Sequence, residues 1–135
     1  MAQFRLPVNS RVKSGKTYKV DTGAKNVRTF SVYRYDPVDG SVQLAIGAKQ
    51  IEKPNGLALS PDGNTLYVAE NNNAPGGRMT LNAFRLRSDG SLGPKKVIVD
   101  FGDEAGIDGM TVDVQGNIYA AVRSARRFGL SLIHI

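Results

Sequence analysis

The chain has 135 residues, enough for one modest domain with a hydrophobic core. Its 41% hydrophobic and 22% charged residues are ordinary for a globular protein, and no apolar run approaches the roughly 20 residues that span a bilayer. The chain contains no cysteine, which excludes disulfides and thiolate metal sites.

The net charge of +6 is concentrated near the two ends of the chain. Residues 1–34 hold eight Lys and Arg against Asp21 alone, and Arg123, Arg126 and Arg127 form a second basic cluster. A basic balance can indicate an anionic partner such as nucleic acid. The aromatic residues that would stack bases are not interleaved with these charges, so we expect a solvated surface and no nucleic acid or membrane partner.

Residues 1–31 show little hydrophobic periodicity, and we interpret them as a lead-in segment. From residue 32 onward, short alternating strands are separated by Gly-containing turns. The segments 32–46, "VYRYDPVDGSVQLAI", and 82–99, "NAFRLRSDGSLGPKKVIV", each predict a hairpin around an Asp-Gly-Ser turn. The turns lie 50 residues apart, at Asp39 and Asp89.

A second pair of hairpins interleaves with the first. The segments 55–69, "NGLALSPDGNTLYVA", and 108–121, "DGMTVDVQGNIYAA", align at an offset of 53 residues with one residue gapped in the turn. The matched positions are Gly56 with Gly109, Gly63 with Gly116, Tyr67 with Tyr119, and Ala69 with Ala121. The two kinds of hairpin therefore alternate along the chain. We call the hairpins at 32–46 and 82–99 outer hairpins, and those at 55–69 and 108–121 inner hairpins.

Two hairpins per repeat make a four-stranded unit of about 50 residues, which is typical of a β-propeller blade. A sandwich or barrel also has many short strands, but neither predicts this period. We therefore expect an all-β chain in which residues 32–129 form about two four-stranded blades. Propellers close with about four to eight blades, so the chain is expected to be a fragment.

The last six residues, 130–135, "LSLIHI", break the pattern of the repeat. They match one reading frame of the mosaic-end adapter used in transposon-based DNA libraries, and we expect them to be an adapter artefact. The single histidine, His134, lies within them, so no catalytic or metal-binding role is assigned to it.

Asn55 and Asp108 stand at equivalent positions of the two inner hairpins. In a propeller the loop that enters the innermost strand lies at the mouth of the central channel, so we expect both side chains there, one blade apart. Amide and carboxylate oxygens are hard ligands that suit divalent cations. Asn-Gly and Asp-Gly are also common turn dipeptides, and spacing alone leaves that alternative open.

The flanks of these two dipeptides are recognisable. "EKPNGLALSPDGNTLYVAE" (52–70) and "VDFGDEAGIDGMTVDVQGNIYAA" (99–121) resemble the SMP-30/gluconolactonase family. The resemblance implies a six-bladed propeller with one divalent cation, Ca²⁺ or Zn²⁺, in its channel. It implies that Asn55 and Asp108 are metal ligands, that Asp108 is also the general base, and that the substrate is a sugar lactone.

The sequence departs from the family pattern at two positions. The metal-binding Glu near the start of the first blade and a channel Asn from an earlier blade have no counterpart here. Two ligands do not fill a site of about six oxygens, so we expect these 135 residues alone to be inactive. A non-catalytic propeller that binds a protein or glycan stays open as the alternative function.

Several further residues lie in loops on the expected channel face. Asn72 and Arg78 are candidates for contact with substrate, although a merely polar loop is also expected from this composition. Asp103 and Glu104 precede Asp108 and are interpreted as a solvated acidic loop.

Overall fold

A computed structural model describes residues 30–123 and 128–133, and these residues form strands and turns without a helix. Among them, no helix is long and apolar enough to cross a membrane. The strands are β1 (Val32–Tyr35), β2 (Val42–Ile46), β3 (Pro54–Leu59), β4 (Thr65–Asn71), β5 (Met79–Arg85), β6 (Lys96–Asp100), β7 (Ile107–Val112), β8 (Ile118–Arg123) and β9 (Phe128–Ile133).

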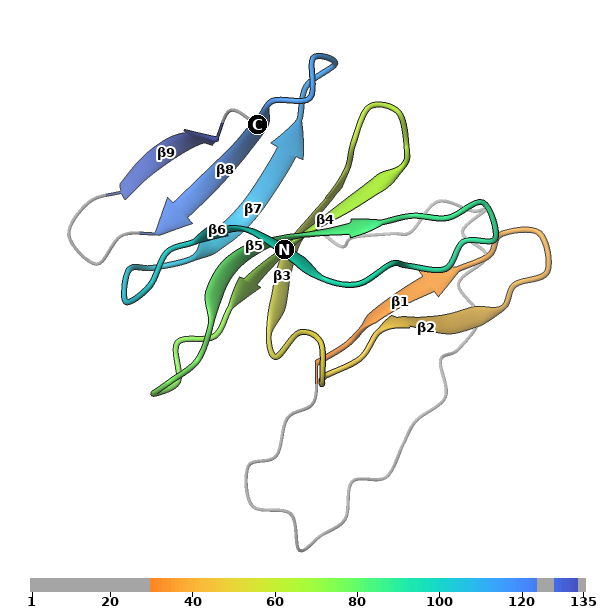
Figure 1. The fold of residues 1–135 in the computed structure, drawn as a ribbon, viewed down its shortest axis with the longest axis horizontal. Helices are drawn as coiled ribbons and strands as arrows, with labels where there is room; N and C mark the ends of the chain where they lie inside the picture. Colours follow the sequence, from red (N-terminus) through yellow and green to blue (C-terminus); the bar gives the residue numbers. More distant parts are fainter. Residues whose placement is uncertain (1–29, 124–127, 134–135) are drawn as a thin grey trace, which may run out of the picture.

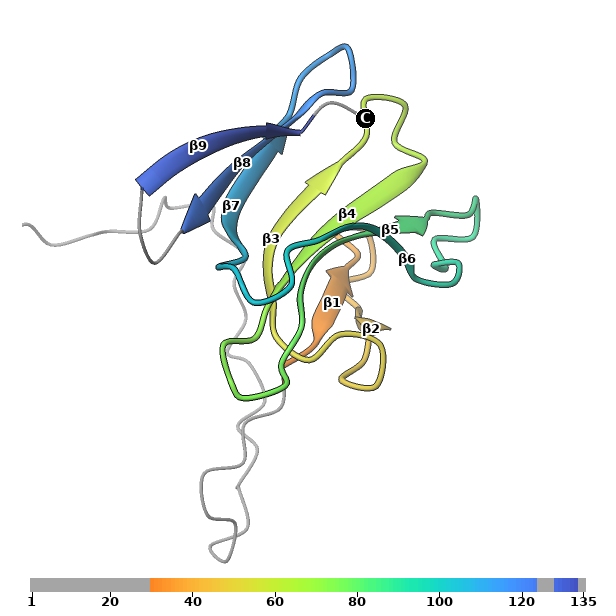
Figure 2. The same cartoon turned by 60° about the vertical axis from the view of Figure 1, so that its left-hand side comes forward.

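The strands form three antiparallel sheets in chain order. A two-stranded sheet β1-β2 is followed by a four-stranded sheet β3-β4-β5-β6 and a three-stranded sheet β7-β8-β9. Figures 1 and 2 show the four-stranded sheet in the middle, with β1-β2 on one side of it and β7-β8-β9 on the other. The predicted alternation of outer and inner hairpins is confirmed, and β3–β6 is one complete blade.

The repeat is visible in individual hydrogen bonds of the turns. The Asp39 carboxylate accepts the Ser41 backbone N–H at 2.7 Å, and Asp89, 50 residues later, accepts the Ser91 N–H at 2.8 Å. A short acidic side chain that bonds to the backbone two residues onward favours a turn over a continued strand. The two outer hairpins therefore turn by the same local chemistry.

Two hydrophobic clusters hold the sheets together, one on each side of the central sheet. Val68 and Ala69 are neighbours in β4, and successive side chains of a strand point to opposite faces of the sheet. Both are fully buried, so both faces of the central sheet are covered. The cluster toward β1-β2 contains Ile46, Ile51, Val68 and Phe84. The cluster toward β7-β8 contains Ala69, Leu81, Ile107, Ile118 and Ala120.

The loops divide between the two ends of the sheets as expected for a blade. Asn71, where β4 ends, donates its backbone N–H to the Lys53 carbonyl in the segment that enters β3. At the opposite end Leu86 donates to the Asn64 carbonyl, which joins the turns of two successive hairpins. The loops that enter β3 and leave β4 therefore share one face.

β9 pairs with β8 from Phe128 to Ile133, so the described strands include part of the tail 130–135. The interpretation of that tail as an adapter artefact stays a prediction. His134 and the lead-in segment up to residue 29 lie outside the described residues.

Truncating the largest buried side chain should test the packing of the central sheet against β1-β2. Phe84 is fully buried in that cluster, so we expect Phe84→Ala to lower the free energy of unfolding by about 3–5 kcal/mol. Urea unfolding measures this change. Val38, 94% exposed in the first turn, supplies the control, and Val38→Ala should change stability by less than about 0.5 kcal/mol. Equal effects of the two changes would contradict the described core.

Candidate metal centre

The structure brings Asn55 and Asp108 into direct contact. The Asn55 carboxamide donates from Nδ2 to Asp108 Oδ1 at 3.1 Å, and both residues are exposed. Asn55 comes from β3 and Asp108 from β7, which are the innermost strands of two sheets and lie side by side. Residues 53 positions apart in the chain are thus neighbours on the exposed surface between two sheets.

A β-bulge lies at each of these two positions. Pro54 pairs with Glu70 and Leu57 with Val68, so β3 uses one more residue than β4 across Asn55 and Gly56. The same extra residue appears in β7, between Ile107 and Met110. Bulges re-aim side chains and are frequent beside active sites. Each inner strand therefore carries its bulge at its candidate ligand.

Gly56 explains how close β3 comes to β7. A Cβ atom at Gly56 would lie 3.0 Å from the Asp108 carbonyl oxygen and 3.3 Å from the Met110 backbone nitrogen. A side chain at this position would be accommodated only by a shift of a few tenths of an ångström between the two strands. The glycine after Asn55 therefore favours the close approach of the strands, and the Asn55–Asp108 contact lies at that approach.

The chemistry of the donor set fits a divalent cation that prefers oxygen. Asp108 supplies carboxylate oxygens, and Asn55 has an amide oxygen besides the Nδ2 group that donates to Asp108. Among the described residues no group of three or more His, Cys, Asp and Glu side chains gathers for a metal. Two protein ligands fall short of the six to eight oxygens that Ca²⁺ takes, so water, substrate or other residues would complete the shell.

The sequence analysis did not single out Glu70, whose carboxylate is fully buried at the end of β4. Its Oε1 accepts the Glu52 backbone N–H at 2.7 Å and the Arg78 guanidinium at 2.9 Å. Its Oε2 accepts the Thr80 hydroxyl at 3.1 Å and lies 3.5 Å from Lys95 Nζ. The buried charge is therefore fully partnered, and it joins the segment entering β3 to the start of β5.

The environment of Glu70 holds its carboxyl in the charged form. Burial by itself would raise the pKa. The hydrogen bonds from Arg78 and from the Glu52 backbone outweigh burial, together with the charges of Lys95 and Arg78, and the pKa is lowered overall.

The repeat contained a signal for Glu70. When the two repeats are aligned with Tyr67 on Tyr119, Glu70 takes the position of Val122, an apolar residue of the second inner hairpin. A charged residue at an aligned apolar position indicates either exposure or a buried ionic partner. In the structure Glu70 is buried and has ionic partners in Arg78 and Lys95.

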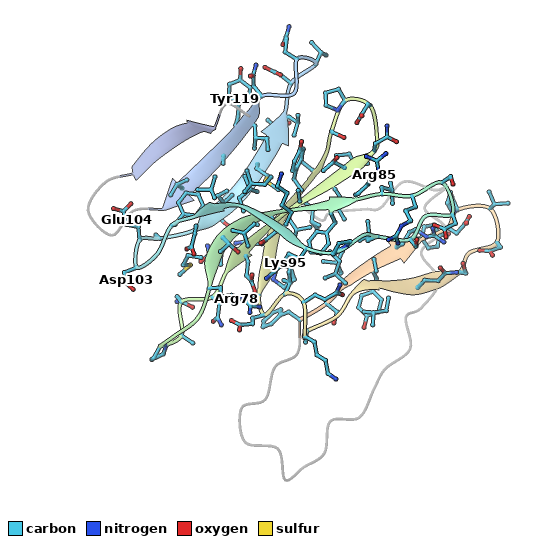
Figure 3. All side chains as sticks on the ribbon, in the orientation of Figure 1. Arg78, Arg85, Lys95, Asp103, Glu104 and Tyr119 are labelled. Carbon is cyan, nitrogen blue, oxygen red and sulfur yellow. The ribbon has the colours of Figure 1, made fainter. Side chains whose placement is uncertain are left out.

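Asn72 and Arg78 both have partners within the protein. Asn72 donates from Nδ2 to Glu52 Oε2 at 2.8 Å, and Arg78 binds Glu70 and lies 3.5 Å from Glu52. The Arg78 side chain is 40% exposed, and Figure 3 shows it with Lys95 on the same side of the ribbon. Their contact with substrate stays a prediction, while their observed role is to fix the loops around Glu70.

Asp103 and Glu104 lie on the exposed β6–β7 loop (Figure 3). This placement agrees with a solvated acidic loop. Tyr119 of β8 packs half-buried and also donates its hydroxyl to Asp113 Oδ2 at 3.1 Å, a bond that raises the pKa of the tyrosine. Asp113 accepts three further donors from its own turn and is a structural residue.

Comparison with known proteins identifies the family of the chain. The model of the SMP-30/gluconolactonase/LRE-like region matches residues 12–129. The chain belongs to this family. The match begins inside the predicted lead-in segment 1–31, and the stretch that resembles the family is therefore longer than the sequence motifs alone indicated.

Two curated proteins show sequence similarity of different extent. The gluconolactonase of Zymomonas mobilis is 32% identical over 114 residues, which cover 79% of this chain and 30% of that protein. A 40-residue stretch is 52% identical to the succinate dehydrogenase iron–sulfur subunit of Paracoccus denitrificans, covering 30% of this chain and 15% of that protein. The second match covers too little of either chain to assign a family.

Solved structures of the family share the fold. A gluconolactonase from Xanthomonas campestris is 35% identical with a TM-score of 0.57, over 73% of this chain and 30% of that one. A calcium-binding regucalcin from Agrobacterium tumefaciens is 28% identical with a TM-score of 0.54, over 68% and 29%. The prediction of a β-propeller fragment of about two blades is confirmed, and the chain spans about 30% of the length of these relatives.

The glycine after Asn55 can be tested with a matched glycine from the second repeat. We expect Gly56→Ala to move β3 a few tenths of an ångström from the Asp108 backbone and to weaken the Asn55–Asp108 hydrogen bond. Gly109→Ala should leave that bond in place, because a Cβ at Gly109 meets no atom within 4 Å. The nuclear Overhauser effect between the Asn55 side-chain amide and the Asp108 β protons measures the contact. An Overhauser effect in Gly56→Ala as strong as in the wild-type chain would contradict the steric argument.

The Glu70 network should make stability depend on pH. The folded pKa lies below the ordinary value of 4.5, so the charged carboxylate stabilises the fold above about pH 4.5, and this contribution is lost as pH falls through the folded pKa. Glu70→Gln should lower the free energy of unfolding at pH 7 by about 1–3 kcal/mol and flatten the acid side of the pH profile. Asp103→Asn, on the exposed loop, is the control. An unchanged acid slope in Glu70→Gln would contradict the assignment.

Proposed function

We propose that the propeller carrying this chain is a divalent-cation-dependent lactone hydrolase. The observation that carries the proposal is the 3.1 Å contact between Asn55 and Asp108, which come from the neighbouring strands β3 and β7. A carboxylate and an amide, each on a bulge of an innermost strand, would both contribute oxygens to one cation. The similarity to gluconolactonases supports this activity, and the calcium-binding regucalcin supports the cation.

When bound, the cation would polarise the lactone carbonyl and balance the negative charge that develops on its oxygen. Asp108 is the group in this chain that can move a proton. Its carboxylate takes a proton from the water that attacks the carbonyl carbon, and the ring C–O bond then breaks. Returning that proton to the ring oxygen yields the open hydroxy acid and restores the carboxylate. Asn55 holds Asp108 in place beside the reacting carbonyl.

A sugar lactone is the proposed substrate, and Ca²⁺ or Zn²⁺ the proposed cation. The names of the Zymomonas and Xanthomonas relatives support the first. Arg78 and Asn72, on the loop that leaves β4, are proposed to lie near the sugar hydroxyls while they remain bonded to Glu70 and Glu52.

Replacing the proposed base should separate catalysis from folding. In the complete propeller, Asp108→Asn should lower kcat for gluconolactone hydrolysis by about 10²–10⁴-fold, the usual contribution of a positioned base. Circular dichroism should show the fold unchanged. Asp103→Asn, five residues earlier on an exposed loop, should retain full turnover.

The same assay distinguishes the proposed hydrolase from the alternative, a non-catalytic binding module. Turnover that is abolished by a chelator and restored by Ca²⁺ or Zn²⁺ supports the hydrolase. Absence of any cation-dependent turnover in the complete propeller, or full turnover in Asp108→Asn, would overturn it. The 135 residues alone should show no turnover, because they supply two ligands.

A further inference from the structure

The end of β4 is bonded to both strands that carry the candidate ligands. Asn71 donates its backbone N–H to the Lys53 carbonyl at 3.0 Å, two residues before Asn55. Its side chain donates from Nδ2 to the Ile107 carbonyl at 3.2 Å, one residue before Asp108. One residue thus bonds to the approach to β3 in its own sheet and to the start of β7 in the next.

The residues on either side of Asn71 also bond to the segment that enters β3. Glu70 accepts the Glu52 backbone N–H, and Asn72 donates to the Glu52 carboxylate. Three successive residues at the end of β4 therefore fix the segment 52–53. These bonds fix the backbone position of Asn71, whose carboxamide donates to the Ile107 carbonyl.

Gly106 confines the Asn71 side chain from the other side. A Cβ atom at Gly106 would lie 3.4 Å from Asn71 Cγ and 3.3 Å from the Glu70 carbonyl oxygen. The chain entering β7 therefore packs directly on the carboxamide. The Asn71 carboxamide is therefore close to the backbone of Gly106 as well as to the Ile107 carbonyl.

We propose that Asn71 is a positioning residue that sets the distance between Asn55 and Asp108, an inference that rests on the proposed function of that pair. It touches neither substrate nor cation. It acts through the backbone on both sides of the site, by fixing where each bulge begins. Bonds of this indirect kind orient metal ligands and are worth about 10–100-fold in metal affinity.

A merely structural Asn71 would behave differently. Its loss would lower stability, as the loss of any partly buried hydrogen bond does, and leave the Asn55–Asp108 pair intact. The two roles are therefore separated by measuring the pair itself, in variants compared with one of similar stability loss. Val99→Ala in β6 is such a variant, because Val99 packs against the hydrophobic cluster toward β7-β8 from the edge of the sheet opposite β3.

The experiment compares the wild-type chain with Asn71→Ala, Asn73→Ala and Val99→Ala by NMR. Asn71→Leu keeps the side-chain volume and replaces Asn71→Ala if that variant does not fold. Asn73, two residues onward, is exposed and accepts a bond from Lys53 Nζ, so its removal is a matched control. The first readout, without metal, is the Overhauser effect between the Asn55 side-chain amide and the Asp108 β protons. The second is broadening of the same amide by Mn²⁺.

We expect Asn71→Ala to lose the Asn55–Asp108 contact and to need about tenfold more Mn²⁺ for equal broadening, while both controls match the wild type. An intact contact in a folded Asn71 variant overturns the inference, whatever the metal result. Absence of Mn²⁺ broadening in the wild-type chain counts against the proposed function alone, because the metal-free contact still decides the role of Asn71.

Discussion

The close approach of β3 and β7 is the constraint on which the candidate site depends. A Cβ atom at Gly56 would lie only 3.0 Å from the Asp108 carbonyl oxygen, and the two inner strands meet at that point. Each strand also carries a bulge there, which turns Asn55 and Asp108 toward one another. The bulges of two separate hairpins thus meet at one candidate site between neighbouring sheets.

Different forces hold the two parts of the fold. Apolar clusters on both sides of the central sheet set the stacking of the sheets and carry most of the burial. At the end that carries the site, the buried Glu70 carboxylate organises the loops through a charge-assisted hydrogen bond from Arg78 and an ion pair with Lys95. A buried charge that lost one partner would be costly, so this arrangement specifies a single loop geometry.

The sequence predicted the hairpins, the repeat and the pairing of Asn55 with Asp108, because alternation and turn chemistry are local and the period places equivalent residues on equivalent strands. The bulges were not predicted, since one extra residue beside a glycine does not disturb the visible alternation. Glu70 was missed because its partners lie 8 to 25 residues away in the chain. Nothing in the sequence indicated that Arg78 binds Glu70, because the distance between these two side chains depends on tertiary structure.

Crystals of the chain grown with Mn²⁺ would test the central claim most directly, that two bulged strands build one cation site. Anomalous scattering locates the ion without reference to activity. The account predicts a peak within about 2.0–2.6 Å of a carboxylate oxygen of Asp108 and of the amide oxygen of Asn55. A peak elsewhere, or an Asn55–Asp108 hydrogen bond that persists in saturating Mn²⁺ with no ion beside it, would contradict the account.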